Sequence, residues 1–233
     1  MKTFKALSAL LSYPTPELVA ALTDIRSTVH MEALLDGNRL AALDELFDWM
    51  GATDIYDMEE TYCLLFDRSR ALSLNLFEHV HGESRDRGQA MVDLKALYAR
   101  HGLDLARGEL PDFLPLFLEF LSILPLQDAR EHLSQAAHIV AALHERLKKR
   151  KSPYSTVLGA IADLAGDGDE FPLVADDGAQ PDDLAALDAA WEEAAVTFGP
   201  GEAGGGCSSE RLATRLRAHQ RAAGAREGGA ANV

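Results

Sequence analysis

Residues 128–149, with the sequence DAREHLSQAAHIVAALHERLKK, decide the fold class that we predict for this chain. Leu133, Val140 and Leu147 recur at a spacing of about two helical turns and therefore lie on one side of a helix. The basic cluster at residues 146–151 follows, and cations are favoured at the negative C-terminal end of a helix dipole. We predict one long amphipathic helix over residues 128–149, capped by this cluster.

Helical periodicity recurs on both sides of this stretch. Pro16 suits the first turn of a helix, and Thr53 or Asp54 can cap the start of another. The alternation typical of β-strands does not occur over a useful length. We therefore predict an all-α, single-domain helical bundle of about eight or nine helices with a disordered C-terminal tail. The other helices are predicted at residues 4–11, 16–25, 38–50, 54–66, 91–98, 113–124, 154–164 and 182–198.

The charge of the chain is distributed unevenly. The net charge is −15, and the stretch from Ser152 to Glu210 contains thirteen carboxylates but no Lys or Arg. Such a block is usually a solvated region, although it could also steer a basic partner toward the protein. The excess of negative charge argues against nucleic acid as a partner, because phosphate binding needs concentrated Lys and Arg.

Composition divides the chain into three parts. We expect a helical domain at residues 1–165, an acidic loop with a C-terminal helix at 166–198, and a disordered Gly/Ala/Arg tail at 199–233. Two widely separated cysteines, Cys63 and Cys207, suit a reducing compartment. No window reaches the roughly 18 apolar residues of a membrane span, and the short apolar run near the N-terminus lacks a cleavage site. We predict a soluble, cytoplasmic protein that does not insert directly into a membrane.

The segment from Leu72 to Leu94 contains the residues best suited to chemistry or recognition. Glu78, His79 and His81 suggest a metal site, but histidines two positions apart diverge on a helix, and no further ligand is indicated. Neither a Ser-His-Asp arrangement nor a phosphate-binding glycine loop can be argued from the spacing. We therefore expect no catalytic residue, no metal and no cofactor, and interpret both histidines as structural or partner-contact residues.

Residues 84–88 could receive an anion. Ser84, Arg85, Arg87 and Gly88 lie just before a predicted amphipathic helix, where free amide donors and two guanidinium groups can bind negative charge. The alternative is that both arginines pair with carboxylates of the same fold. The first interpretation predicts a contact with a partner protein, or with the phosphate of that partner's cofactor.

Large apolar side chains are concentrated in residues 62–77 and 114–120. Most of them are expected in the core. If the helices that carry them leave a furrow, the remaining side chains would line a groove for an amphipathic peptide helix. Neighbouring carboxylates would favour a peptide that carries Lys or Arg. The apolar candidates are Tyr62, Phe66, Leu72, Leu74, Leu76, Phe77, Leu114, Leu118 and Phe120, and the carboxylates are Asp67, Glu78, Asp112 and Glu119.

Several motifs together resemble those of a known family. They are FKxLSxLLxYP at residues 4–14, YxxLFD at 62–67, SLxL at 73–76, EHxHGxSRxRG at 78–88, LPDxLP at 110–115 and LEFL at 118–121. In this combination the chain resembles the nitrate reductase molybdenum cofactor assembly chaperones of the NarJ type, which belong to the redox-enzyme maturation group. The similarity covers roughly residues 4–164.

The resemblance implies an all-helical chaperone rather than an enzyme. Members of the family bind the N-terminal peptide of the catalytic (alpha) subunit of respiratory nitrate reductase. They hold the apo subunit for insertion of the molybdenum cofactor before it docks at the membrane. Carried onto this chain, the resemblance implies that residues 62–77 and 110–120, including Pro111 and Asp112, receive that peptide. Proteins that deliver the molybdenum cofactor would be further partners.

Other functions stay open on the sequence. The protein could assemble a different molybdoenzyme, including one exported with a twin-arginine leader. It could be a weak nucleotide hydrolase or a permanent subunit of a membrane complex. The sister branch that serves exported enzymes tends to place a His after the Pro-Asp pair, whereas this chain has Phe113. That difference favours the nitrate reductase branch.

Overall fold

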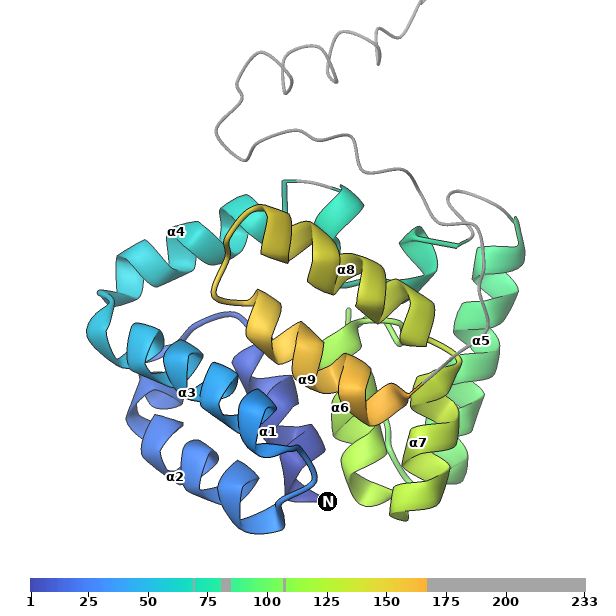
Figure 1. Cartoon of the computed structure of the whole chain (residues 1–233). Helices are drawn as coiled ribbons and strands as arrows, with labels where there is room; N and C mark the ends of the chain where they lie inside the picture. Colours follow the sequence, from blue (N-terminus) through green and yellow to red (C-terminus); the bar gives the residue numbers. More distant parts are fainter. Residues whose placement is uncertain (69, 81–84, 107, 167–233) are drawn as a thin grey trace, which may run out of the picture. The chain divides into compact units, whose positions relative to one another are not determined.

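The computed structural model describes residues 1–68, 70–80, 85–106 and 108–166, which fall in one compact unit of the chain. Across these ranges the regular structure is helical, with a single isolated β-bridge and no strand, so the predicted all-α fold class is confirmed (Figure 1). The predicted acidic loop, C-terminal helix and tail lie, beyond Gly166, outside the described residues. The elements are α1 (Lys2–Leu10), α2 (Pro16–Glu32), α3 (Gly37–Ala52), α4 (Ile55–Phe66), η1 (Arg70–Leu72), η2 (Leu76–Glu78), α5 (Arg85–Arg100), α6 (Leu114–Ile123), α7 (Leu126–Ser134), α8 (Ala137–Lys149) and α9 (Ser155–Ala165), where η1 and η2 are 3-10 helices.

Local capping signals set where two of the helices begin. The Thr15 hydroxyl oxygen accepts a hydrogen bond from the backbone N–H of Leu18 at 3.2 Å, with Pro16 in the first turn of α2. The Asp54 carboxylate accepts one from the backbone N–H of Tyr56 at 2.9 Å. Both side chains satisfy donors that the start of a helix leaves without an intrahelical partner. The predicted helix starts at these two places are confirmed.

The single long helix predicted over residues 128–149 is wrong, because the stretch forms two helices. α7 ends at Ser134 and α8 begins at Ala137. Figure 1 shows the two helices running in different directions. α7 packs against α6 and α9, whereas α8 packs along α9 and against η1. A turn at Gln135 and Ala136 lets the apolar residues on each side reach different neighbours.

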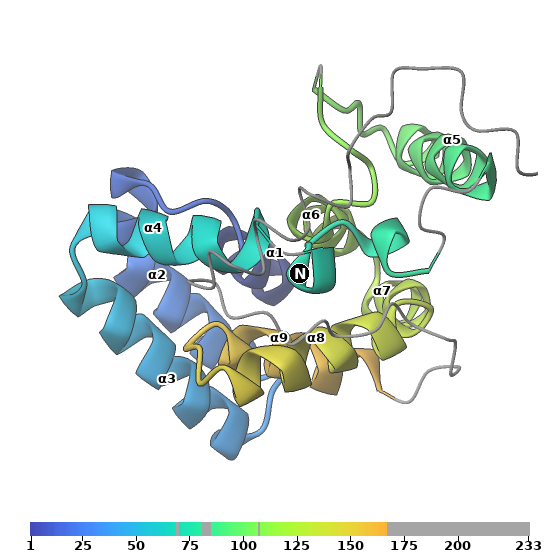
Figure 2. The ribbon, with the colours of Figure 1, turned by 90° about the horizontal axis from the view of Figure 1, so that it is seen from above.

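The core is centred on α1 and α9, whose apolar faces are almost completely buried. α1 packs against α6 and α2, and α9 packs against α8, α3 and α7 (Figures 1 and 2). Burial of this kind supplies most of the free energy that holds short helices together. The apolar side chains of these two helices that have no exposed surface are Phe4, Leu7, Leu10, Val157, Leu158, Ala160 and Ile161.

The described helices are short. The longest, α2, has 17 residues, and the very apolar α6 has 10. A helix that crosses a bilayer needs about 20 predominantly apolar residues. None of the helices in the described ranges is therefore long and apolar enough to span a membrane.

Candidate functional site

Two of the sequence motifs lie side by side in the structure. The backbone N–H of Leu76 donates to the carbonyl oxygen of Asp112 at 2.9 Å, and the N–H of Leu114 donates to that of Leu74 at 2.8 Å. These bonds flank an isolated antiparallel bridge. They join the loop around η2 to the start of α6, so the structure brings residues 73–76 and 110–115 together.

Asp112 holds this junction from inside the protein. Its side chain is fully buried, and its Oδ2 atom accepts a hydrogen bond from the backbone N–H of Phe77 at 3.0 Å. Oδ1 is also buried and has no hydrogen-bond partner among the described residues. Burial raises the pKa of the Asp112 carboxyl above its ordinary value, although the hydrogen bond from Phe77 and the positive charge of Arg87 oppose that shift. We interpret Asp112 as a structural acceptor for the η2 loop.

His79 has a similar role in the same loop. It is 1% exposed, and its Nε2 atom donates to the carbonyl oxygen of Ser73 at 2.7 Å. Burial lowers the pKa of the imidazole below its ordinary value, which favours the neutral ring. His81 and Ser84 lie outside the described residues, as does the side chain of Arg85. Within the described ranges, no group of three or more His, Cys, Asp or Glu side chains is placed to bind a metal ion.

Arg87 pairs with a carboxylate of the same fold. Its Nη2 atom lies 3.2 Å from Oε1 of Glu78, and both side chains are only about a fifth exposed. This is one of the two possibilities that the sequence leaves open for the arginines of residues 84–88. Gly88 is exposed in the first turn of α5. The pair links the start of α5 to η2.

The large apolar residues of the predicted groove are mostly core residues, and they fall into two groups. The Tyr62 and Phe66 rings pack around Tyr154, with centroids 6.1 Å and 5.3 Å from that ring. Phe120 packs instead against Tyr98 of α5, with centroids 4.7 Å apart. The buried candidates are Tyr62, Phe66, Leu72, Leu74, Leu76, Pro111, Leu114, Leu118 and Phe120.

The predicted carboxylates do not gather in one place. Asp67 is exposed at the end of α4, and Glu119 is exposed on α6, where it pairs with Lys5 of α1 at 3.4 Å. Glu78 and Asp112, by contrast, are near η2. The structure therefore places two of the four acidic candidates beside the loop junction and two elsewhere.

An apolar pocket of about 330 Å³ opens next to the loop junction, between η2 and helices α5, α6, α7 and α8. We call it the α5–α8 pocket. Its side chains are mainly aliphatic and aromatic, with a few polar groups, as is usual for sites that bind ligands. Val80 is 38% exposed, so the apolar surface reaches the outside of the protein. The lining residues are Leu76, Phe77, Val80, Leu94, Phe117, His132, Gln135, Ala136, His138 and Ile139.

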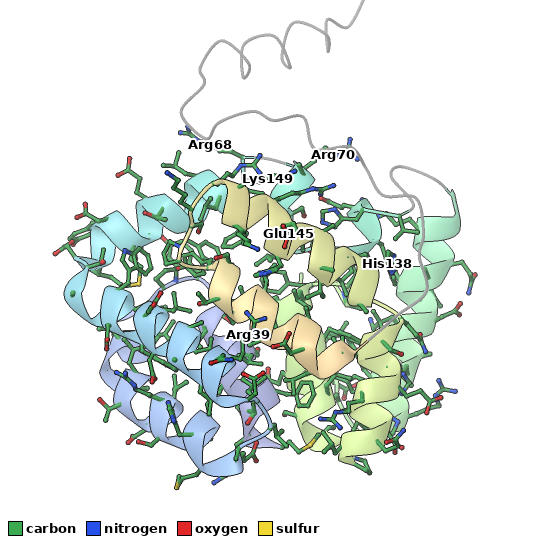
Figure 3. The ribbon with its side chains drawn as sticks, in the orientation of Figure 1. Arg39, Arg68, Arg70, His138, Glu145 and Lys149 are labelled. Atoms are coloured by element: carbon green, nitrogen blue, oxygen red, sulfur yellow. The ribbon has the colours of Figure 1, made fainter. Side chains whose placement is uncertain are left out.

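Of the residues that line the pocket, the sequence motifs predict only Leu76 and Phe77 as site residues. The remaining residues come from α5, α6, α7, α8 and the turns after η2 and α7, so no single stretch of sequence contains the pocket. One signal was available: His132, Gln135 and His138 recur every three residues beside the apolar stripe of residues 128–149. Figure 3 shows His138 near the end of α8 that faces α5. Polar side chains at helical spacing beside an apolar stripe can mark the rim of a pocket.

α5 is the least embedded wall of the pocket. Among its described side chains Tyr98 is the buried one, and its hydroxyl donates to the carbonyl oxygen of Pro111 at 2.7 Å. Leu94 and Leu97 pack partly against the core. Figure 2 shows α5 at the edge of the helical body. Helices with few buried apolar contacts open at lower free energy than core helices.

Comparison with known proteins relates the chain to one family. Residues 32–159 match the family described as nitrate reductase delta subunit. The nitrate reductase molybdenum cofactor assembly chaperone NarJ of Escherichia coli K12 is 43% identical over 218 residues, which cover 92% of this chain and 89% of NarJ. NarW of the same strain is 40% identical over 201 residues, covering 85% of this chain and 84% of NarW.

A solved structure supports the fold. The crystal structure of a candidate redox enzyme maturation protein from Archaeoglobus fulgidus superposes with a TM-score of 0.52 and 21% sequence identity. The match covers 70% of this chain and 93% of the Archaeoglobus chain. At this identity the likeness is informative about the helical architecture alone.

Proposed function

Because the chain belongs to the nitrate reductase delta subunit family, we propose that it is an assembly chaperone that holds the apo catalytic subunit of a nitrate reductase until the molybdenum cofactor is inserted. The observation that carries this proposal is the identity with NarJ, which extends over nearly the whole chain. The named relatives of this length are assembly chaperones, which supports a binding protein rather than an enzyme. We expect the chaperone to bind its client in the cytoplasm, before the nitrate reductase docks at the membrane.

The proposed ligand is the N-terminal peptide of the catalytic subunit, and the proposed site is the α5–α8 pocket. The pocket is adjacent to the residues for which sequence motifs predict peptide contact, and it includes Leu76 and Phe77. Its volume is at the lower end of the roughly 300–1,000 Å³ that is usual for ligand pockets. It would therefore accept one or two apolar anchors of an amphipathic helix, with the rest of the peptide along its rim.

The buried residues of the predicted groove have a supporting role in this proposal. Asp112 and His79 fix the η2 loop, and that loop presents Leu76, Phe77 and Val80 to the pocket. Tyr98 and Phe120 hold the α5 wall against α6. A displaced α5 would expose additional apolar surface, so the peptide could extend contacts beyond the resting volume.

The proposed mechanism is thermodynamic. A chaperone that binds only the immature conformer stabilises that conformer by an amount set by the ratio of free chaperone to the dissociation constant. At one hundred times the dissociation constant the stabilisation is about 2.7 kcal/mol. Insertion of the cofactor would remove the binding conformation and release the chaperone. No covalent step is required.

A charge placed in the pocket tests the site. We expect Val80→Asp to weaken binding of the synthetic N-terminal peptide by about tenfold or more in calorimetry, because the peptide's apolar anchor would meet a carboxylate. Ile123→Asp is the matched control, since Ile123 is 52% exposed on α6 and does not line the pocket. Equal affinity for both variants would exclude the pocket as the peptide site.

A competition experiment separates the proposed client from the alternative one. The nitrate reductase peptide should displace a labelled copy of itself at lower concentration than a twin-arginine leader peptide of another molybdoenzyme does. The opposite order would assign the chain to an exported molybdoenzyme. The identity with NarJ and Phe113 after the Pro-Asp pair both favour the nitrate reductase client.

A further inference from the structure

Cations gather where the last turn of α8 meets η1 and the turn before α9. We call this surface the α8 basic patch and define it by Arg68, Arg70, Lys148, Lys149, Arg150 and Lys151. Figure 3 shows Arg68, Arg70 and Lys149 along one edge of the helical body. Arg146 holds the edge together, because its Nη1 atom donates to the carbonyl oxygen of Ala71 at 2.7 Å and so fixes η1 beside α8.

Capping of the α8 dipole does not account for the whole patch. Lys148 and Lys149 lie in the last turn of α8, where cations are favoured. Arg68 and Arg70 come from the other side of the patch, at the end of α4 and in η1, and stabilise no helix end of α8. Two separate parts of the chain therefore contribute cations to one surface.

Four of the six cations of the patch form no ion pair within the described part of the protein. Lys148 pairs with Glu145 at 3.6 Å. Arg68, Arg70, Lys149 and Lys151 are all exposed, and none of them forms an ion pair with another described residue. Neighbouring like charges repel one another, so an exposed cationic cluster favours an anionic occupant.

The same chain contains an acidic segment next in sequence to α9. Residues 167–183 contain seven carboxylates and no Lys or Arg. Residues 44–60 contain as many carboxylates, but they belong to α3, α4 and the turn between these helices, whereas residues 167–183 follow directly on α9. Charge complementarity therefore points to residues of this chain itself as the occupant of the patch.

We propose that residues 167–183 bind the α8 basic patch within the same molecule. α8 and α9 pack side by side and are joined by a short turn, so α9 returns along α8 and Gly166 follows its far end (Figure 1). With 13 residues, α8 is about 20 Å long. An extended chain covers that distance in about six residues, so the carboxylates from Asp176 to Asp183 can reach the patch.

Because residues 167–183 and the patch belong to one chain, even weak ion pairs between them can form a populated contact. Single surface ion pairs contribute little to stability, but several carboxylates on one segment act together against several cations. A short tether also keeps the segment at an effective concentration in the millimolar range. An anionic surface of another protein would have to displace the segment before it could use the patch.

Zero-length cross-linking of the full chain tests this inference. A carbodiimide joins a lysine amine to a carboxylate only where the two are in contact, and mass spectrometry identifies the joined peptides. We expect links from Lys148, Lys149 or Lys151 to residues 167–183 at low salt. They should fall by about fivefold or more at about 0.5 M NaCl, where exposed charges are screened. Lys2 and Lys5, exposed on α1, provide the internal control and should form few such links.

Charge reversal separates a specific contact from chance encounters. The double variant Arg70→Glu, Lys149→Glu should abolish the links from Lys148 and Lys151 to residues 167–183. Adding Asp176→Lys and Asp177→Lys to that variant should restore binding of the segment to the patch, measured by salt-sensitive line broadening in NMR spectra. Arg70 and Lys149 are both exposed, so their substitution should leave the fold intact. Links spread evenly over Lys2, Lys5 and the patch would overturn the proposal. Links found only between isotopically distinct copies would overturn it too, because the contact would then join two molecules.

Discussion

At the scale of single residues, two buried polar side chains fix the loop that forms one wall of the α5–α8 pocket. Asp112 accepts the backbone N–H of Phe77, and His79 donates to the carbonyl oxygen of Ser73. A buried backbone group that has lost its hydrogen bond to water destabilises a fold unless another partner replaces it. Asp112 and His79 supply that partner for the N–H of Phe77 and the carbonyl oxygen of Ser73. The positions of Leu76 and Phe77 therefore depend on two residues that do not line the pocket.

Substitution of Asp112 separates its hydrogen bond from its charge. Asp112→Ala should lower the free energy of unfolding by about 1–3 kcal/mol, because the N–H of Phe77 loses its acceptor in a buried place. Asp112→Asn keeps an acceptor oxygen and removes a charge that burial disfavours, so it should retain most of the stability. Chemical denaturation of both variants measures the difference. Equal stability of the alanine and asparagine variants would show that the hydrogen bond is unimportant.

The protonation of His79 predicts a pH dependence of stability. Burial lowers the pKa of His79 in the folded state below its ordinary value of 6.5, so the unfolded chain binds the proton more readily. The contribution of neutral His79 is complete above about pH 6.5 and is lost as the pH falls toward the folded-state pKa.

Denaturant titrations of the wild type and His79→Gln at pH 7.5 and 5.5 measure this contribution. The glutamine side chain can still donate to Ser73 but does not titrate. The wild type should therefore lose more stability than the variant between the two pH values. A parallel loss in both proteins would mean that His79 is not the titrating group.

At the scale of elements, the helices follow the sequence pattern where their packing is simple. Periodicity and caps predict the bounds of α4 and α9 to within one residue, and they predict the start of α2 at Pro16 but end that helix at Ile25, seven residues before Glu32. The break between α7 and α8 could not be predicted in the same way. The apolar stripe continues through Gln135 and Ala136, and only the positions of α6, α9 and η1 require the chain to turn there. The start of α5 at Arg85 was also missed, since its first turn contains charged residues and Gly88.

The weak attachment of α5 predicts a gradient of hydrogen exchange. Amides of α5 should exchange through local opening, well before those of α1 and α9, which open only when the whole fold does. Tyr98→Phe should speed exchange in α5 further, because it removes the hydrogen bond to Pro111, while leaving α1 unchanged. Exchange measured by mass spectrometry resolves the three helices. Uniform protection across them would contradict a displaceable α5.

At the scale of the whole molecule, the sequence motifs indicate which segments matter, but not the surface that they form together. The motifs at residues 73–76 and 110–115 do meet, and Leu76 and Phe77 do line a pocket. Composition does not reveal which of the large apolar residues are buried in the core, because the same residue types also line grooves. The lining from α5, α7 and α8 depends on how four helices come together, which no local pattern encodes.

Co-purification tests whether the protein binds the apo form of the nitrate reductase catalytic subunit. The tagged full chain would be expressed with the nitrate reductase catalytic subunit in two hosts, one that makes the molybdenum cofactor and one that does not. An assembly chaperone should co-purify with the apo subunit from the second host and should be absent from the cofactor-loaded enzyme of the first. Equal recovery with both forms, or a stable place in the mature enzyme, would contradict the function proposed for this protein.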